Sequence, residues 1–130
     1  MKNENKPISI TNIDTLKRYS KGMVVELPSF AEGQPFIVRL ARPSLMSMAA
    51  EGKIPNPLMS TVTKMFFGKI SDAAVDLTEW YQVMEIFAEA CLMEPTYKQI
   101  KEAGISLTDE QYLNIFNYCQ SGIKAVKSLF

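Results

Sequence analysis

The sequence LTEWYQVMEIFAEACLM, residues 77–93, carries apolar side chains around most of a helix. One side of that helix would hold Leu77, Trp80, Met84, Phe87 and Cys91, and a second side would hold Val83, Ile86, Ala90 and Met93. A narrow polar stripe is formed by Gln82, Glu85 and Glu89. A helix that is apolar over most of its circumference must be covered by other elements, so this segment predicts the centre of a helical body.

Capping residues predict shorter helices on both sides of this segment. The expected ranges are residues 45–51, 57–67 and 96–103. Ser44 and Asn56 stand where the first two helices begin, and their side chains can accept hydrogen bonds from the free backbone amides there. The body is therefore expected to contain several short helices around the central one.

A longer helix is predicted at the carboxyl end of the sequence. Thr108 and Gln111 have the spacing of a capping box, which closes a helix start by two reciprocal hydrogen bonds. An apolar stripe then continues in phase from Tyr112 through Gly122 to Phe130. Glycine costs about 1 kcal/mol inside a helix, so Gly122 predicts a kink or the close approach of another helix.

The first third of the chain has strand character. Residues 23–27 and 35–41 alternate apolar and polar side chains, which predicts a β-hairpin with a longish connection over residues 28–34. Before it, Ile8 and Ile10 alternate with polar neighbours and predict a short strand. A helix capped by Asn12 is expected to run from residue 13 to residue 21.

These elements predict a mainly α protein with a small N-terminal β-hairpin, an α+β fold with a compact helical body. We expect a flexible tail over residues 1–7 and a single domain over residues 8–130. The strand and hairpin part covers residues 8–42, and the helical part covers residues 43–130. The length of 130 residues is that of one ordinary domain.

Charge is balanced over the chain but not along it. Fourteen basic and fourteen acidic residues give a net charge of zero. Residues 1–53 hold eight basic and five acidic side chains, a net charge of +3, whereas residues 54–130 hold six and nine, a net charge of −3. A small basic cluster is indicated by Lys17, Arg18, Lys21, Arg39, Arg42 and Lys53. Such a cluster is usually ordinary surface, and nucleic-acid binding is not expected.

The residues of catalytic sites are largely missing. The chain contains no histidine, which removes the usual general base and the usual zinc ligand. No phosphate-binding loop or nucleophile motif occurs, so we predict no enzyme activity, no cofactor and no metal. Cys91 and Cys119 fall on apolar stripes and are expected to be reduced core thiols. No apolar run reaches the length of a membrane span, which favours a soluble cytosolic protein.

Methionine supplies the candidate binding residues. Eight methionines are present, and this flexible side chain suits surfaces that pack against a partner. Met46 and Met48, beside Leu45 in a short helix, are the candidates there. Leu129 and Phe130 are candidates at the chain end, where the apolar stripe lacks a glycine cap or charged tail. The alternative is that most methionines, and Phe130 with them, belong to the core.

Two blocks of sequence resemble the tail assembly chaperones of long-tailed phages and prophages of Gram-positive bacteria. The first block, residues 26–58, contains Glu-Leu-Pro, Gly-Gln-Pro-Phe, Arg-Pro-Ser and Gly-Lys-Ile-Pro-Asn in that order. The second block, residues 93–126, contains Glu-Pro-Thr, Leu-Thr-Asp, then Phe116 and residues 120–122. Each motif alone can be a turn or a cap, and the resemblance lies in their joint order.

The resemblance implies a viral chaperone that binds the tape measure protein and keeps it soluble while major tail protein subunits polymerise. It implies action in the host bacterial cytoplasm and absence from the mature virion. It also implies a short form alongside a frameshifted longer form with a different partner, while self-association stays open. The alternative is a small non-enzymatic regulatory adaptor that binds a protein or a DNA-bound partner.

Overall fold

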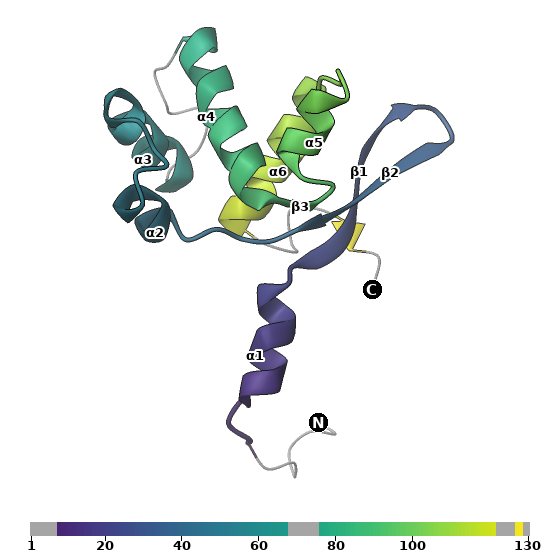
Figure 1. Cartoon of the computed structure of the whole chain (residues 1–130), viewed down its shortest axis with the longest axis vertical. Helices are drawn as coiled ribbons and strands as arrows, with labels where there is room; N and C mark the ends of the chain where they lie inside the picture. The colour runs from purple at the N-terminus through teal and green to yellow at the C-terminus, as the bar shows by residue number, and fades with distance from the viewer. Residues whose placement is uncertain (1–7, 68–75, 122–126, 129–130) are drawn as a thin grey trace.

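The computed structural model describes residues 8–67, 76–121 and 127–128. Helices surround one end of a small antiparallel sheet, and one helix projects away from both (Figure 1). The sheet has four strands in the order β3-β2-β1-β4. Their bounds are β1 Met23–Ala31, β2 Gln34–Leu40, β3 Leu92–Glu94 and β4 Lys127–Ser128. The predicted combination of helices with a small N-terminal hairpin is therefore confirmed.

The hairpin of β1 and β2 is longer than the sequence predicts, and its turn is shorter. The first strand continues to Ala31 and the second begins at Gln34, so Glu32 and Gly33 alone form the turn, and the expected loop over residues 28–34 is wrong. Gly33 has a φ of 78°, a conformation that favours glycine in such a tight turn. The register is irregular between Leu27 and Ala31, and pairing of Ala31 with Gln34 then carries the hairpin beyond the point where the two prolines suggested a loop.

The predicted apolar face of the hairpin is confirmed. Val25 and Leu27 on β1 and Val38 and Leu40 on β2 are buried, because alternate side chains of a strand point to the same face. Near the turn the strands leave the body and their side chains become exposed. There the rings of Phe30 and Phe36 pack together with centroids 5.0 Å apart.

The helices follow their predicted caps closely. Their bounds are α1 Ile13–Ser20, α2 Leu45–Ala50, α3 Met59–Phe67, α4 Leu77–Cys91, α5 Tyr97–Glu102 and α6 Asp109–Ser121, and a 3-10 turn η1 Asn56–Leu58 precedes α3. Asn12, Ser44 and Asp76 accept hydrogen bonds from backbone amides at the starts of α1, α2 and α4. The expected cap at Asn56 is wrong, because Asn56 lies inside η1, where Pro55 holds the cap position without a side-chain bond.

Two further predictions are corrected by strands that form between distant segments. The last helix ends at Ser121, and residues 127–128 pair with Val25 and Glu26 of β1 instead of continuing the helix. The central helix ends at Cys91, and the following residues pair with β2. Residues 8–10 form no strand. Residues 1–7, the helix end at Gly68 and the position of Gly122 lie outside the described residues.

One buried cluster joins the sheet to the helices. Phe87 of α4 and Phe116 of α6 are fully buried, and their rings meet edge to face with centroids 5.1 Å apart. Val25 and Leu40 from the sheet belong to the same cluster. The prediction that the helix over residues 77–93 forms the centre of the body is thus confirmed for the part that is helical, Leu77–Cys91.

Cys91 and Cys119 form a disulfide between α4 and α6. Both residues are buried on apolar stripes, as predicted, but the expectation of two reduced thiols is wrong. The physical reason is that the two stripes face each other, so packing α4 against α6 brings the two sulfurs together.

Helix α1 projects from the sheet on the side away from the other helices (Figure 1). It has no buried residue. Gly22 connects it to β1 with a φ of 85°, and a Cβ atom at this position would collide with the carbonyl group of Leu40. Glycine is therefore required at the junction both by the backbone conformation and by the lack of space.

Candidate binding surface

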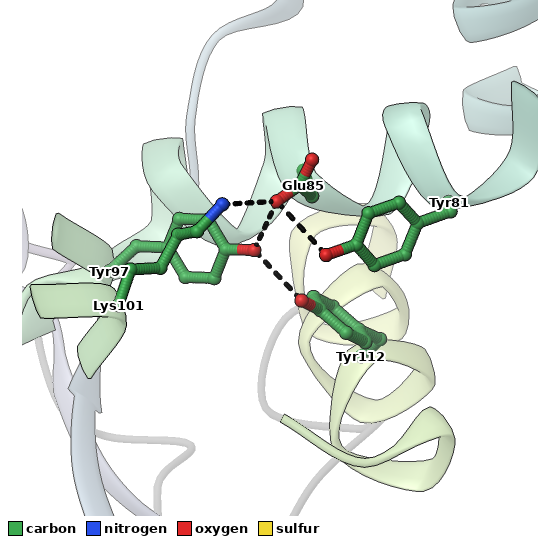
Figure 2. Close-up of polar contacts among 5 residues, drawn as sticks. All are labelled: Tyr81, Glu85, Tyr97, Lys101 and Tyr112. Carbon is green, nitrogen blue, oxygen red and sulfur yellow. Dashed lines mark hydrogen bonds and ion pairs between the residues drawn. The ribbon is translucent and has the colours of Figure 1, made fainter. Parts of the chain in front are cut away.

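A carboxylate on α4 holds three helices together (Figure 2). Oε2 of Glu85 accepts hydrogen bonds from the hydroxyls of Tyr81 at 3.1 Å and Tyr97 at 2.7 Å, and from Nζ of Lys101 at 2.8 Å. The hydroxyl of Tyr112 on α6 lies 2.8 Å from that of Tyr97. Tyr97 gives its single hydroxyl hydrogen to Glu85, so Tyr112 is the donor in this last contact. We call these five residues the Glu85 cluster.

The sequence interpretation of Glu85 is corrected by this cluster. Glu85 and Glu89 were both expected on a solvated stripe, and Glu89 is indeed exposed. The side chain of Glu85 is only 27% exposed and carries three hydrogen bonds. The sequence carries a signal for this cluster in two i, i+4 pairs, Tyr81 with Glu85 and Tyr97 with Lys101. Residues four apart lie one above the other on a helix, so their side chains can interact.

The ionisation states of the cluster suit a structural role. Partial burial would raise the pKa of Glu85, but hydrogen bonds from Lys101, Tyr97 and Tyr81 outweigh it and lower the pKa. The hydrogen bond to Glu85 raises the pKa of Lys101. Burial and hydrogen bonding raise the pKa of Tyr97, and burial chiefly raises that of Tyr112 to about 12. These shifts keep Glu85 and Lys101 charged and Tyr97 and Tyr112 neutral at neutral pH, the states in which their hydrogen bonds tie the three helices together.

An apolar groove lies next to this cluster, between α4 and α6. It has a volume of about 420 Å³ and is lined by Leu77, Thr78, Trp80, Tyr81, Met84, Asp109, Tyr112 and Leu113. Leu77 is 79% exposed, and Tyr81 is 47% exposed. We call it the α4–α6 groove. Its volume and apolar lining are those of a site that can receive side chains of a partner.

The groove is bordered by acidic residues. Asp109 lines it directly, and Glu110 follows in the first turn of α6. Asp76 caps the start of α4 by accepting a 2.8 Å hydrogen bond from the backbone amide of Glu79. Acidic residues from the starts of both α4 and α6 thus lie beside one apolar site.

Trp80 is an unusual member of the groove lining. Its ring packs against the core, and its indole Nε1 is buried without a hydrogen-bond acceptor among the described residues. A buried N–H group without a partner loses the hydrogen bond it makes with water in the unfolded chain. The predicted packing of Trp80 with the core is confirmed, but its side chain is only partly buried.

A second apolar surface is formed by α1. Ile13, Leu16 and Tyr19 recur every three residues and are 65%, 48% and 69% exposed. Lys17, Arg18 and Lys21 place positive charge on the remaining circumference of this helix. This surface, which we call the α1 face, was not singled out by the sequence, because an amphipathic pattern there is equally typical of a helix packed on its own core.

The residues proposed from the sequence as binding residues are separated in the structure. Met46 is 82% exposed, Leu45 packs partly against the core, and Met48 is only 4% exposed. Met48 is therefore core, in line with the alternative noted for most methionines. Leu129 and Phe130 lie outside the described residues.

The basic cluster is only partly assembled. Arg18, Arg39 and Arg42 line one cavity at the junction of α1 and the sheet. However, Arg39 pairs with Glu94 at 3.3 Å, and Arg42 donates a 2.8 Å hydrogen bond to the carbonyl oxygen of Gln120. Both guanidinium groups thus have partners within the chain, which gives no support to a phosphate-binding surface.

Other kinds of site find no geometric support in the described parts of the chain. Within residues 8–67, 76–121 and 127–128, no three His, Cys, Asp or Glu side chains are grouped to hold a metal ion. Over the same ranges, no helix combines the length and the apolar character needed to cross a bilayer.

Comparison with known proteins adds no relative. No family model, no curated protein and no solved structure matches this chain. A functional proposal therefore rests on the surfaces described above and on the order of the sequence motifs.

Proposed function

We propose that this chain is the short form of a tail assembly chaperone of a long-tailed phage or prophage. In this role it binds the tape measure protein and keeps it soluble in the host bacterial cytoplasm while the tail tube polymerises. A frameshifted longer form and the major tail protein are further partners in the proposal. The chaperone leaves before the virion is complete.

The observation that carries the proposal is that the two sequence blocks form one structural unit. Gln111 in the second block donates a 2.8 Å hydrogen bond to the carbonyl oxygen of Pro28 in the first. Arg42 in the first block donates to the carbonyl oxygen of Gln120 in the second. The motifs of the resemblance therefore meet across the fold, which supports treating their joint order as one pattern and not as unrelated turns.

The exposed surfaces agree with a binding role. The α1 face and the α4–α6 groove both present large apolar side chains, and contiguous exposed apolar patches mark interaction sites. The observed geometry does not add support to the adaptor alternative, because Arg39 and Arg42, two arginines of the basic cluster, are paired within the chain.

The test is co-expression with the tape measure protein encoded beside this chain. We expect a higher soluble fraction of the tape measure protein and a complex that survives purification. Since the proposed contacts are apolar, the complex should persist between about 50 and about 200 mM salt, where phosphate-neutralising complexes weaken strongly. An unrelated coiled-coil protein serves as the control partner. Failure to increase solubility, or the absence of a tape measure gene nearby, would contradict the proposal.

A further inference from the structure

The α4–α6 groove has the spacing of a seat for a third helix. Apart from Thr78, its lining residues follow the i, i+3, i+4 spacing of one helix face: Leu77, Trp80, Tyr81 and Met84 on α4, and Asp109, Tyr112 and Leu113 on α6. Leu77 and Met84 lie seven residues apart, so the groove runs along about two turns of α4, roughly 10 Å. Two such rows of side chains leave between them the kind of furrow into which the side chains of another helix pack.

The walls of the groove favour a helix over an extended peptide. Within α4 and α6 the backbone groups are bonded to each other, and at the helix starts Asp76 and Thr108 accept hydrogen bonds from backbone amides. An extended peptide needs backbone partners, such as a strand edge, and these walls offer none. A helix bonds its own backbone and presents side chains only. The occupant that fits is therefore an amphipathic helix with apolar side chains at i, i+3, i+4 and i+7.

The charge beside the groove indicates the charge of that helix. Asp109 lines the groove, and Asp76 and Glu110 stand at the starts of α4 and α6. The side chains of Asp109 and Glu110 are exposed, so they can meet a partner. None of the described residues that line the groove is basic. A helix with Lys or Arg beside its apolar stripe would be attracted to this rim, whereas one with Asp or Glu would be repelled.

We propose that the α4–α6 groove binds a basic amphipathic helix of the tape measure protein. This inference rests on the proposed function, and it names by its chemistry the segment of the partner that the chain recognises. Apolar contacts with Leu77 and with the half-exposed ring of Tyr81 supply the affinity, and the acidic rim sets the orientation and excludes acidic helices. Because the rim charges are exposed and screened, binding should weaken only severalfold between about 50 and about 200 mM salt.

Two synthetic peptides test the chemistry of the groove on the purified full chain. Both have about 18 residues, long enough to form a helix, with leucine at i, i+3, i+4 and i+7. One carries lysine beside the leucine stripe, and the other carries glutamate at the same positions. Titration calorimetry should show the lysine peptide binding about tenfold or more tightly than the glutamate peptide. A scrambled lysine peptide without the stripe is the control for unspecific attraction and should not bind.

Variants of the groove connect this binding to named residues. Leu77→Lys should weaken binding of the lysine peptide by about tenfold or more, because it removes an apolar contact and adds a repulsive charge. Asp109→Lys combined with Glu110→Lys should reverse the preference between the two peptides. Asp109→Asn combined with Glu110→Gln should abolish the preference, and it replaces the reversed variant if that fails to fold. Glu51→Lys makes the same charge change at the end of α2 and should have no effect.

Co-expression tests whether the tape measure protein supplies the helix. Leu77→Lys should reduce the amount of tape measure protein recovered with the chain by about fivefold or more. Met46→Glu is the matched control, because Met46 is as exposed as Leu77 but lies on α2. The lysine peptide should also displace the tape measure protein from the chain, and the glutamate peptide should not. Circular dichroism checks that each variant keeps its fold.

The outcomes that overturn this inference differ from those that overturn the proposed function. Equal binding of the two peptides, or binding that Leu77→Lys leaves unchanged, would show that the groove does not select a basic helix. Full recovery of the tape measure protein with every groove variant would place its binding elsewhere and leave the proposed function intact. Binding of the lysine peptide without any binding of the tape measure protein would contradict the proposed function, and with it this choice of partner.

Two other occupants of the groove are separated by further measurements on Leu77→Lys. If this substitution lowers the free energy of unfolding of the monomer, the chain covers its own groove. If it lowers the mass observed in sedimentation, a second copy of the chain occupies the groove. Either result would contradict the proposal.

Discussion

The side-chain amide of Gln111 donates a 2.8 Å hydrogen bond to the carbonyl oxygen of Pro28, 83 residues earlier in the chain. Oε1 of the same side chain accepts a 2.9 Å bond from the backbone amide of Thr108, and Gln111 is completely buried. One side chain thus closes the start of α6 and holds the point where the hairpin leaves the body.

Replacing Gln111 should therefore lower the free energy of unfolding. We expect Gln111→Ala to lower the free energy of unfolding by about 2–4 kcal/mol, because it removes a fully buried side chain together with the partners of the Pro28 carbonyl oxygen and the Thr108 amide. Gln111→Glu keeps the acceptor but loses the donor, and its buried carboxylate should make the variant more stable as the pH falls. Urea denaturation followed by circular dichroism measures both. Gln99→Ala, which breaks the exposed capping box of α5, is the control and should cost about 1 kcal/mol.

Glu85 should make stability depend on acid pH. Its folded pKa is lowered, so its contribution is complete above the unfolded pKa and is lost as the pH falls through the folded pKa. We expect Glu85→Gln to cost about 1 kcal/mol at neutral pH and progressively less below the ordinary range of a glutamate pKa. Glu89→Gln, at an exposed position of the same helix, should change little at any pH. Equal pH profiles for the wild type and Glu85→Gln would contradict the role of the cluster.

Two glycines with similar φ should respond differently to alanine. Gly22→Ala places a Cβ atom against the backbone of Leu40, whereas a Cβ at Gly33 meets nothing within 4 Å. We expect Gly33→Ala to cost about 1–2 kcal/mol from backbone strain alone, and Gly22→Ala to cost clearly more. Thermal melts of the two variants compare them directly. Similar losses would show that the α1–β1 junction relaxes around the added methyl group.

Trp80 should tolerate phenylalanine better than alanine. Trp80→Phe loses part of the packing of the ring, but it also removes the indole N–H that lacks a partner among the described residues. The second effect offsets much of the first, so we expect the free energy of unfolding to fall by about 1 kcal/mol or less. Trp80→Ala should cost about 2–4 kcal/mol, at or below the usual range for a buried ring because Trp80 is only partly buried. Chemical denaturation of the two variants measures the difference between their free energies of unfolding. A phenylalanine variant as unstable as the alanine variant would show that the indole N–H has an acceptor.

The disulfide between Cys91 and Cys119 determines how many reactive thiols the unfolded chain should show. Protein purified without reductant and then unfolded should show no reactive thiol, because Cys91 and Cys119 are joined. Reduction should lower the free energy of unfolding by about 3–4 kcal/mol, the loop-closure contribution for a bond that spans 28 residues. Two thiols per unfolded chain would favour the reduced state expected of a cytosolic protein.

Local signals account for the parts of the fold that the sequence predicts. Asn12, Ser44 and the pair Thr108 and Gln111 act through hydrogen bonds to neighbours three residues away, so their roles are visible in a short stretch. The alternation of Val25 with Leu27 likewise depends only on strand geometry.

Long-range contacts account for most of what the sequence does not show. Residues 127–128 follow a helical pattern locally, but they pair with β1, and such tertiary pairing overrides a weak local preference. The meeting of Tyr112 with Tyr97, and hence the Glu85 cluster, depends on how α5 and α6 pack. The exposure of α1 could not be inferred either, because an apolar stripe does not reveal whether its cover belongs to the same molecule.

The single tryptophan of the chain lines the α4–α6 groove. Its fluorescence therefore reports on this one place, without a label and without background from another indole. An apolar ligand entering the groove would remove water from the exposed part of the ring, shift the emission to shorter wavelength and protect it from a soluble quencher. The fluorescence of this tryptophan can therefore be used to titrate occupation of the groove in solution.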